Sequence, residues 1–231
     1  MSKNYYSAIK QLRVQKGLSQ SEIAQKMGMP RTSYVSFEQG KRDISLAEAA
    51  QLADIFGISL EDIERGIMPN YEKYKEMILA FLRSIATPDG KIPKTKLAKL
   101  VYLADFSWFY KKLESMSGMQ YRKIQYGPVP DSYFRAIDEL EESGKIVIDR
   151  KSSEGKEMLL IAESQSNVNE KMSFLSKAEL VLIQNIAKKW KDKKTNEIVN
   201  FTHNQLPYLI SRDNEIIPYE LITQEDPQYV Y

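Results

Sequence analysis

Signals for short helices near the start of the chain constrain its fold most. Ser19 and Glu22 have the spacing of a capping box, in which each side chain bonds a free backbone amide at the beginning of a helix. Ser45 and Glu48 repeat this arrangement. Gly28 lies between the two boxes, where a glycine can end a helix in the left-handed conformation at little cost. We therefore predict a series of short, closely spaced helices in the first part of the chain.

Two of these helices form a helix-turn-helix pattern on either side of Gly28. Pro30 suits the first turn of the second helix, because a missing amide proton costs nothing there, and Gly40 ends that helix. The apolar positions of the pair are Ile23, Ala24, Met27, Met29, Tyr34 and Phe37. Further helices that would close a five-helix core carry Leu46, Leu52, Ala53, Phe56, Ile58 and Ile63.

Positive charge is concentrated in this part of the chain. Residues 1–42 hold eight Lys or Arg and two acids, a balance of +6, whereas residues 43–66 have a balance of −5. A local basic patch is the expected footprint of contacts with phosphate groups. Charge alone would favour the plainer interpretation of a solvated helix face, so the motif has to decide between the two interpretations.

The stretch "LSQSEIAQKMGMPRTSYVSFEQGKRDISLAEAAQLADIFGISLEDI" resembles the Xre/Cro/C1 family of phage-repressor DNA-binding domains. The resemblance includes the opening of the second helix, the turn glycine and the E-x-G-K-R ending, although Gln39 replaces the usual asparagine. It implies a lambda-repressor-like DNA-binding domain over residues 1–66. Members of this family usually bind palindromes as dimers, so we expect a homodimer on a palindromic operator, read in the major groove.

The resemblance also implies a set of DNA-contacting residues. Gln20 would contact a backbone phosphate and brace the recognition helix, while Arg31, Thr32 and Ser36 would reach base edges. An arginine near the start of a helix can bind guanine O6 and N7 with both arms. Ser33, Lys41 and Arg42 would contact phosphate, whereas Tyr34 and Phe37 would belong to the core.

The rest of the chain reads as a second, larger and mainly helical domain over residues 71–231, joined by a linker at 67–70. Residues 71–86 have an amphipathic pattern, and a helix from Lys94 is apolar nearly all round, as expected for a central helix. "KIVID" and "EMLLIA" predict a small β-hairpin. Ser176 and Glu179 form another capping box, which opens a helix through Trp190.

The stretch "QYGPVPDSY" at 125–133 predicts a rigid corner. Gly127 supplies backbone freedom, Pro128 and Pro130 each restrict one φ angle, and Asp131 or Ser132 could cap the helix that follows. We expect this helix to span Asp131–Ser143, with Tyr133, Phe134, Ile137 and Leu140 facing inward.

Four short motifs of this second part, "KLAKLVYLADF", "YGPVP", "LSKAE" and "THNQLPY", resemble the Panacea domain, also called SocA-like or GepA-type. Tyr208 stands where the family usually has a tryptophan. The resemblance implies an antitoxin that neutralises a protein toxin by direct binding and represses its own operon through the first domain. Candidate toxin contacts are Tyr102, Asp105 and Tyr126, although Asp105 fits a buried, hydrogen-bonded acid better than a functional carboxylate.

Several functional classes find no support in the residues. The chain has no Cys and a single His, His203, so it lacks the usual ligands of a zinc site, and it has no thiol nucleophile. It also lacks a phosphate-binding glycine loop, and its second domain offers one His, scattered acids and no nucleophile motif. Since acid–base catalysis needs convergent titratable groups, we expect no enzymatic activity, no cofactor and no metal. The absence of Cys, of a signal segment and of an apolar run of about 18 residues leads us to expect a cytoplasmic protein without membrane contact.

Three alternatives stay open from the sequence. The second domain could sense a small ligand, because an apolar pocket leaves no sequence signature. It could instead act as an adaptor that delivers a toxin to a protease, as at least one Panacea relative does. The element order over 94–162 also matches a winged helix, but the candidate reading helix has one Arg against five acids, and DNA phosphates would repel it.

Overall fold

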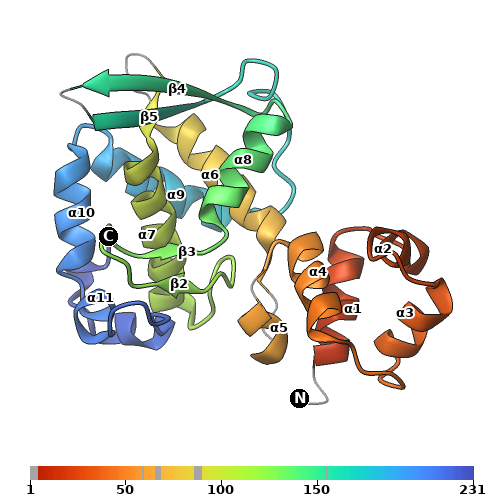
Figure 1. Ribbon diagram of the computed structural model, residues 1–231. Coiled ribbons are helices and arrows are strands. Elements are labelled where there is room, and N and C mark those ends of the chain that lie inside the picture. Colours follow the sequence, from red (N-terminus) through yellow and green to blue (C-terminus); the bar gives the residue numbers. More distant parts are fainter. Residues whose placement is uncertain (1–4, 59, 66–68, 86–89, 154–155) are drawn as a thin grey trace. The chain divides into compact units, whose positions relative to one another are not determined.

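The computed structural model describes residues 5–58, 60–65, 69–85, 90–153 and 156–231 (Figure 1). It contains two compact units, Met1–Glu72 and Lys73–Tyr231. The division therefore falls inside helix α6 (Tyr71–Ser84), close to the predicted domain boundary. Of the predicted linker 67–70, residues 67 and 68 lie outside the described residues.

The first unit contains the five predicted helices. They are α1 (Tyr5–Gln15), α2 (Gln20–Lys26), α3 (Arg31–Glu38), α4 (Leu46–Phe56) and α5 (Leu60–Arg65). Both predicted capping boxes form, at Ser19 with Glu22 and at Ser45 with Glu48, and Gly28 has a left-handed φ of 63°. The local signals of the sequence therefore define these helices correctly.

Two predictions about this core are wrong in detail. Leu46 is 68% exposed, because it lies in the first turn of α4, beyond the end of the packed core. Pro30 precedes α3 as its N-cap residue and does not lie in the first turn. Met29 is partly buried against the core, and the other predicted positions are buried. The larger members of the core are Ile23, Tyr34, Phe37, Leu52 and Phe56.

Helix α7 (Lys94–Lys112) runs through the middle of the second unit (Figure 1). Its residues 96–107 are all buried, which confirms the prediction of a central helix. It contacts α9 (Lys177–Trp190), α10 (Thr195–His203) and the 3-10 helix η1 (Tyr219–Gln224). A helix surrounded in this way must be apolar on most of its faces.

The predicted hairpin is present and belongs to a larger sheet. Strands β4 (Ile146–Ser153) and β5 (Lys156–Glu163) pair antiparallel, and β1 (Ile92–Pro93) adds a third strand beside β5. A second small sheet joins β2 (Tyr121–Arg122) to β3 (Val129–Pro130) on either side of the corner. The two-residue strands were not predicted, because a segment this short has no measurable periodicity.

Helix α8 (Tyr133–Glu142) starts later than predicted. Ser132 occupies its N-cap position without a side-chain capping bond, and Asp131 pairs with Arg122 at 3.2 Å instead. Phe134 is 51% exposed, which corrects the prediction that it faces inward. The described residues of 94–162 contain two helices, α7 and α8, separated by the small β2–β3 sheet, so the three-helix order of a winged helix is absent there.

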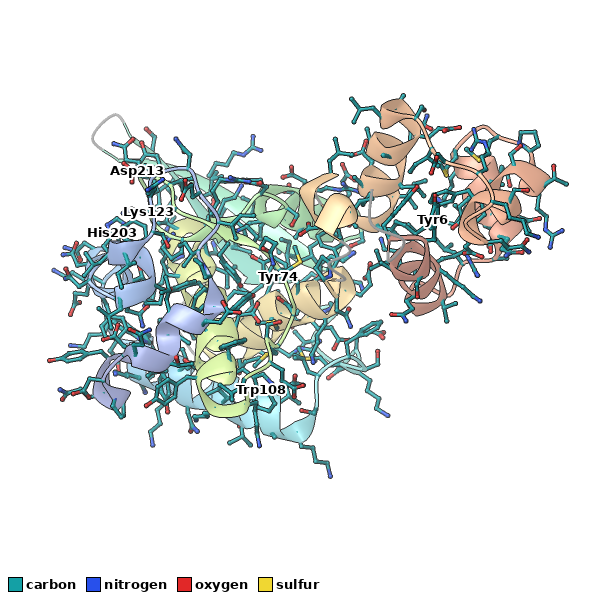
Figure 2. All side chains as sticks on the ribbon, turned by 90° about the horizontal axis from the view of Figure 1, so that it is seen from below. Tyr6, Tyr74, Trp108, Lys123, His203 and Asp213 are labelled. Carbon is teal, nitrogen blue, oxygen red and sulfur yellow. The ribbon has the colours of Figure 1, made fainter. Side chains whose placement is uncertain are left out.

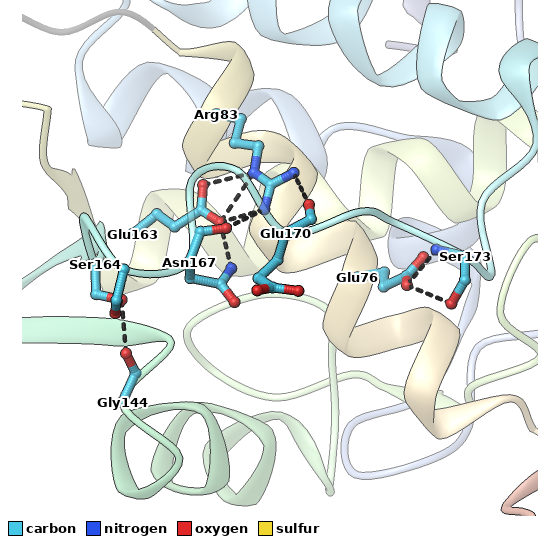
Figure 3. A network of polar contacts seen from close by, with 9 residues as sticks. Glu76, Arg83, Gly144, Glu163, Ser164, Asn167, Glu170 and Ser173 are labelled. Carbon is cyan, nitrogen blue, oxygen red and sulfur yellow. Dashed lines mark hydrogen bonds and ion pairs between the residues drawn. The ribbon is translucent and has the colours of Figure 1, made fainter.

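Polar contacts attach the segment between β5 and α9 to helix α6 (Figure 3). Arg83 donates to the Glu163 carboxylate at 2.7 Å and to the backbone oxygens of Asn167 and Glu170. Closer to the start of α6, the Glu76 carboxylate accepts the backbone amide of Ser173 at 2.7 Å. These bonds connect residues about eighty to one hundred positions apart, so they define tertiary structure that local patterns do not encode.

The chain ends in α11 (Leu206–Ile210), η1 and a second 3-10 helix, η2 (Pro227–Tyr229). The buried Gln205 side chain donates to the backbone oxygens of Tyr229, at 2.7 Å, and Val230, which attaches the last residues to the domain. Among the helices of the described residues, none is both long enough and apolar enough to cross a bilayer.

Candidate functional site

The recognition-helix residues divide into a buried and an accessible set, as the sequence predicts. Tyr34 and Phe37 are fully buried on the inner face of α3. Arg31 and Thr32 are exposed, and Ser33 and Ser36 are partly exposed. Helix α3 therefore presents short polar side chains and one arginine on the face that its core leaves open.

Glu38, at the end of α3, is a buried polar node of the first unit. It accepts hydrogen bonds from Arg13 at 2.6 Å, from the Gln20 side chain at 2.7 Å and from the Tyr34 hydroxyl at 3.3 Å. Burial opposes ionisation of Glu38, but the bonds from Arg13 and Gln20 outweigh it and hold its pKa below the usual range. An ionised carboxylate with these donors connects α1, α2 and α3.

Gln20 connects the Glu38 carboxylate to the exposed start of α3. Its side-chain oxygen accepts a hydrogen bond from the Arg31 guanidinium at 3.3 Å, while its amide group is bonded to Glu38. The first residue of α2 is thus bonded to both ends of α3. This contact orients the exposed Arg31 guanidinium at the start of α3.

The basic residues of the first unit do not all face solvent. Arg13 pairs with Glu38, and Lys16 donates to the backbone oxygen of Ile55 at 2.9 Å. Arg42 is partly exposed and pairs with Glu48 at 2.7 Å, beside the capping box of α4. Among the residues of the first unit whose exposure the structure describes, the exposed cations are Lys10, Lys26, Arg31 and Lys41. The sequence could not separate these two groups, because charge counts carry no information about burial.

Of the three residues predicted to contact a toxin, only Tyr126 lies at the surface, where it is 70% exposed. Tyr102 and Asp105 are fully buried, so neither side chain can touch a partner at the surface, and the predicted contact set must be corrected. Asp105 accepts bonds from the Ser117 backbone amide at 2.9 Å and the Tyr121 hydroxyl at 3.1 Å, and also from the Ser117 hydroxyl. Burial raises its pKa. It is the hydrogen-bonded internal acid that the sequence favoured.

The corner at Gly127 is packed against two other elements. Gly127 has a left-handed φ of 93°, and a Cβ atom there would lie 2.7 Å from Lys99 Cε and 2.8 Å from His203 Nε2. Lys99 comes from α7, and its ammonium donates to the Pro128 backbone oxygen at 3.1 Å. Only glycine fits here, because both the φ angle and the available space exclude a side chain.

His203, at the end of α10, also packs against this corner. Its ring stacks on that of Tyr208 with centroids 4.4 Å apart, and the Tyr208 hydroxyl donates to the Ile124 backbone oxygen at 2.9 Å. Figure 2 shows Lys123, His203 and Asp213 at the same end of the second unit. The ammonium of Lys123 lies 3.6 Å from the Asp213 carboxylate. His203 therefore packs as a structural residue of this corner, with its ring against that of Tyr208.

Lys99 is the functional candidate that sequence reasoning missed. It is 2% exposed, and burial lowers its pKa to about 7. A signal was available, because Lys99 lies between Ala98 and Leu100 in a helix that is apolar nearly all round.

Among the described residues there is no group of three or more His, Asp or Glu side chains arranged to hold a metal ion.

Two family models match this chain. A helix-turn-helix model matches residues 9–63, and a model described as antitoxin SocA-like, Panacea domain, matches residues 97–207. The chain carries an Xre-type helix-turn-helix domain and a SocA-like Panacea domain. The matched part of the Panacea domain begins in α7 and includes Lys99, Asp105, the Gly127 corner and His203.

Curated relatives give shorter matches. The chain is 38% identical over 55 residues to an uncharacterized HTH-type transcriptional regulator of Methanocaldococcus jannaschii, which covers 24% of this chain and 83% of the relative. It is 24% identical over 85 residues to the cryptic phage CTXphi transcriptional repressor RstR of Vibrio cholerae, covering 37% of this chain and 77% of the relative. No solved structure gives a significant match.

These matches support a DNA-binding protein of the antitoxin or regulator class. The matched families are regulatory, which is consistent with the expectation of a protein without enzymatic activity.

Proposed function

We propose that this protein is the antitoxin of a type II toxin–antitoxin system. Its Panacea domain would neutralise a protein toxin by direct binding, and its helix-turn-helix domain would repress the operon that encodes both proteins. The observation that carries the proposal is the presence of both domains in one chain, with Arg31 exposed at the start of α3.

On the DNA side, α3 would enter the major groove of a palindromic operator bound by a homodimer. Arg31 would bind a guanine, with Thr32 and Ser36 at neighbouring base edges. The phosphate contacts would come from Gln20, Ser33, Lys41 and Arg42. The hydrogen bond that Arg31 donates to the Gln20 side-chain oxygen supports this assignment, because it orients the arginine before DNA is bound.

On the toxin side, Tyr126 is the residue we propose as a contact. It is a large aromatic side chain exposed beside a corner whose backbone is held by Lys99 and by Tyr208. Aromatic residues on a rigid support lose little conformational entropy on binding, and they are common at energetically important positions of interfaces.

Growth rescue tests the proposal. The product of the gene adjacent to this one is induced alone and together with the full chain, and the purified pair is tested for a stable complex. We expect arrest of growth by the neighbour, rescue by this protein and a complex of the two. A neighbour that is harmless, or that is neutralised without binding, would contradict the proposal.

The same experiment separates direct neutralisation from delivery to a protease. If the protein neutralises by occupying the toxin, the toxin accumulates to a normal level in rescued cells. If it acts as an adaptor, the toxin level falls during rescue and recovers when the responsible protease gene is deleted.

A further inference from the structure

The Panacea domain contains a pocket of about 470 Å³ beside the Gly127 corner. It opens between the start of α7, residues 124–129, the start of α8 and strand β5. Its volume is in the range of about 300 to 1,000 Å³ that is typical of small-molecule sites. The apolar side chains that line it include Ala98, Ile124, Val129, Phe134, Met158 and Leu159.

A buried cation lies in the wall of this pocket. Lys99 is one of the lining residues and is almost completely buried, with one hydrogen bond to the Pro128 backbone oxygen. An ammonium group has three donors, and burying it beside the His203 ring with a single backbone acceptor is unfavourable. Burial lowers the pKa of Lys99 for the same reason, because the charged form loses its hydration. An anion in the pocket would offset this cost.

The other charges of the pocket have the same sign. Lys94 also lines it, with its ammonium 4.7 Å from the centre of the Phe134 ring. Among the described residues that line the pocket, none is acidic. Thr95 and Thr195 add hydroxyl groups that can donate hydrogen bonds. The polar groups of the site are therefore suited to a negatively charged ligand.

The mouth of the pocket is apolar and accessible. Tyr126, Phe134 and Met158 all line it, and all three are among the large apolar side chains that the structure leaves exposed. The ligand that matches this lining has an apolar body of moderate size and a single anionic group. Lys99 is the almost completely buried cation of this lining, so one anionic group is the partner that it lacks.

We propose that this pocket binds a small apolar carboxylic acid, whose carboxylate pairs with Lys99 and whose hydrocarbon body fills the space between α7, α8 and β5. Nothing in this inference requires the protein to bind a toxin. It adds to the antitoxin a site at which a metabolite of this chemical class would act on the Panacea domain.

Isothermal titration of the full-length protein tests the site with a matched pair of probes, 1-naphthylacetate and its neutral amide, 1-naphthylacetamide. We expect the acid to bind at least about tenfold more tightly than the amide, since a hydrogen bond between two charged groups is stronger than one to a neutral amide. Decanoate serves as a second acid with a different body. Equal binding of acid and amide, or no binding of either acid, would overturn the proposal.

The variant Lys99→Met removes the charge and keeps the length of the side chain. We expect it to bind the acid and the amide equally. Lys96→Met is the matched control, because Lys96 is a second buried lysine of α7 that donates to the backbone oxygens of Lys191 and Lys193 and does not line the pocket. It should keep the wild-type preference for the acid. An unchanged preference in Lys99→Met would place the anion elsewhere.

A second variant leaves α7 unchanged. Thr195→Trp, at the start of α10, puts a large side chain into the pocket and should abolish binding of both acids without loss of thermal stability. Unchanged binding in this variant would show that the acids occupy another site. Two results together would overturn the proposal in favour of a protein side chain as the occupant. The wild-type protein would bind neither acid, and the Thr195→Trp variant would no longer bind the toxin.

Discussion

The side-chain amide of Gln20 donates to the buried carboxylate of Glu38 at 2.7 Å. This bond joins the beginning of α2 to the end of α3, and it fixes which end of the Gln20 amide group points toward Arg31. The buried Glu38 carboxylate therefore influences how a side chain at the surface is oriented. It holds Gln20, and Gln20 holds the arginine that we propose as a base-reading residue.

Replacement of Gln20 should weaken DNA binding more than it weakens the fold. Gln20→Ala leaves Glu38 bonded to Arg13 and Tyr34, so the loss of stability should be about 1 kcal/mol. Arg31 loses its support, and we expect operator affinity to fall about tenfold, measured by fluorescence anisotropy at fixed salt. Gln25→Ala, at an exposed position of the same helix, is the control. Equal operator affinity of the two variants would show that Gln20 does not contribute to DNA binding.

Arg31→Ala should abolish operator preference while the protein still rescues cells from its toxin. A bidentate arginine–guanine pair contributes about 1–3 kcal/mol of discrimination, so specific binding should approach binding to scrambled DNA. Lys41→Ala should instead weaken binding to both DNAs by a similar factor and make the salt dependence shallower, as expected for a phosphate contact. Loss of rescue in a folded Arg31→Ala protein would contradict this separation of tasks.

The stability of the Panacea domain should increase with pH between about 7 and 9 because of Lys99. The pKa of Lys99 is about 7 in the folded protein, against 10.5 for a free lysine, so in this window the unfolded chain binds more protons than the folded one. The expected gain is about 2 kcal/mol, measured by denaturant unfolding at several pH values. His203 on α10 is the titratable neighbour, and burial lowers its pKa, so it stays neutral above pH 7.

Lys99→Met should flatten this pH dependence, whereas Lys177→Met, at an exposed position of α9, should leave it unchanged. The same slope in wild type and in Lys99→Met would mean that another group is responsible.

Gly127→Ala should destabilise the second unit by more than about 2 kcal/mol, because it adds a steric clash to an unfavourable φ angle. The new Cβ would lie within 3 Å of both Lys99 and His203. Gly144→Ala is the matched control, with a φ of 69° and no atom within 4 Å of the place that its new methyl group would take, so it should cost only about 1 kcal/mol. Thermal unfolding of the two variants measures the difference. Equal melting temperatures would show that the corner can rearrange.

Tyr126→Ala should reduce affinity for the toxin by about tenfold or more without a change in melting temperature, because an exposed aromatic contributes to binding and little to the fold. Asp105→Asn should lower the melting temperature and leave the affinity for the toxin unchanged, since it disturbs a buried hydrogen-bonded acid far from the surface. Complex formation by the two variants, measured by calorimetry, distinguishes an interface residue from an internal one. A Tyr126→Ala protein with full affinity would exclude this side chain as a contact.

Short-range signals made much of the fold predictable. The capping boxes at Ser19, Ser45 and Ser176 each form between residues three positions apart, so their meaning is independent of the rest of the chain. The separation of Tyr34 and Phe37 from Arg31 follows from helical periodicity in the same way. The sequence by itself therefore determined the helices of the first unit, the central helix, the hairpin and the candidate DNA-reading face.

Only the tertiary structure decided which side chains those elements bury and which they expose. The pairing of Gln20 with Glu38, the enclosure of Lys99 by the Gly127 corner and the burial of Asp105 all depend on contacts between separate elements. Leu46 and Phe134 stay 68% and 51% exposed, although each belongs to a helix with a buried face. Periodicity tells which residues share a face, but the partner of that face comes from a distant part of the chain.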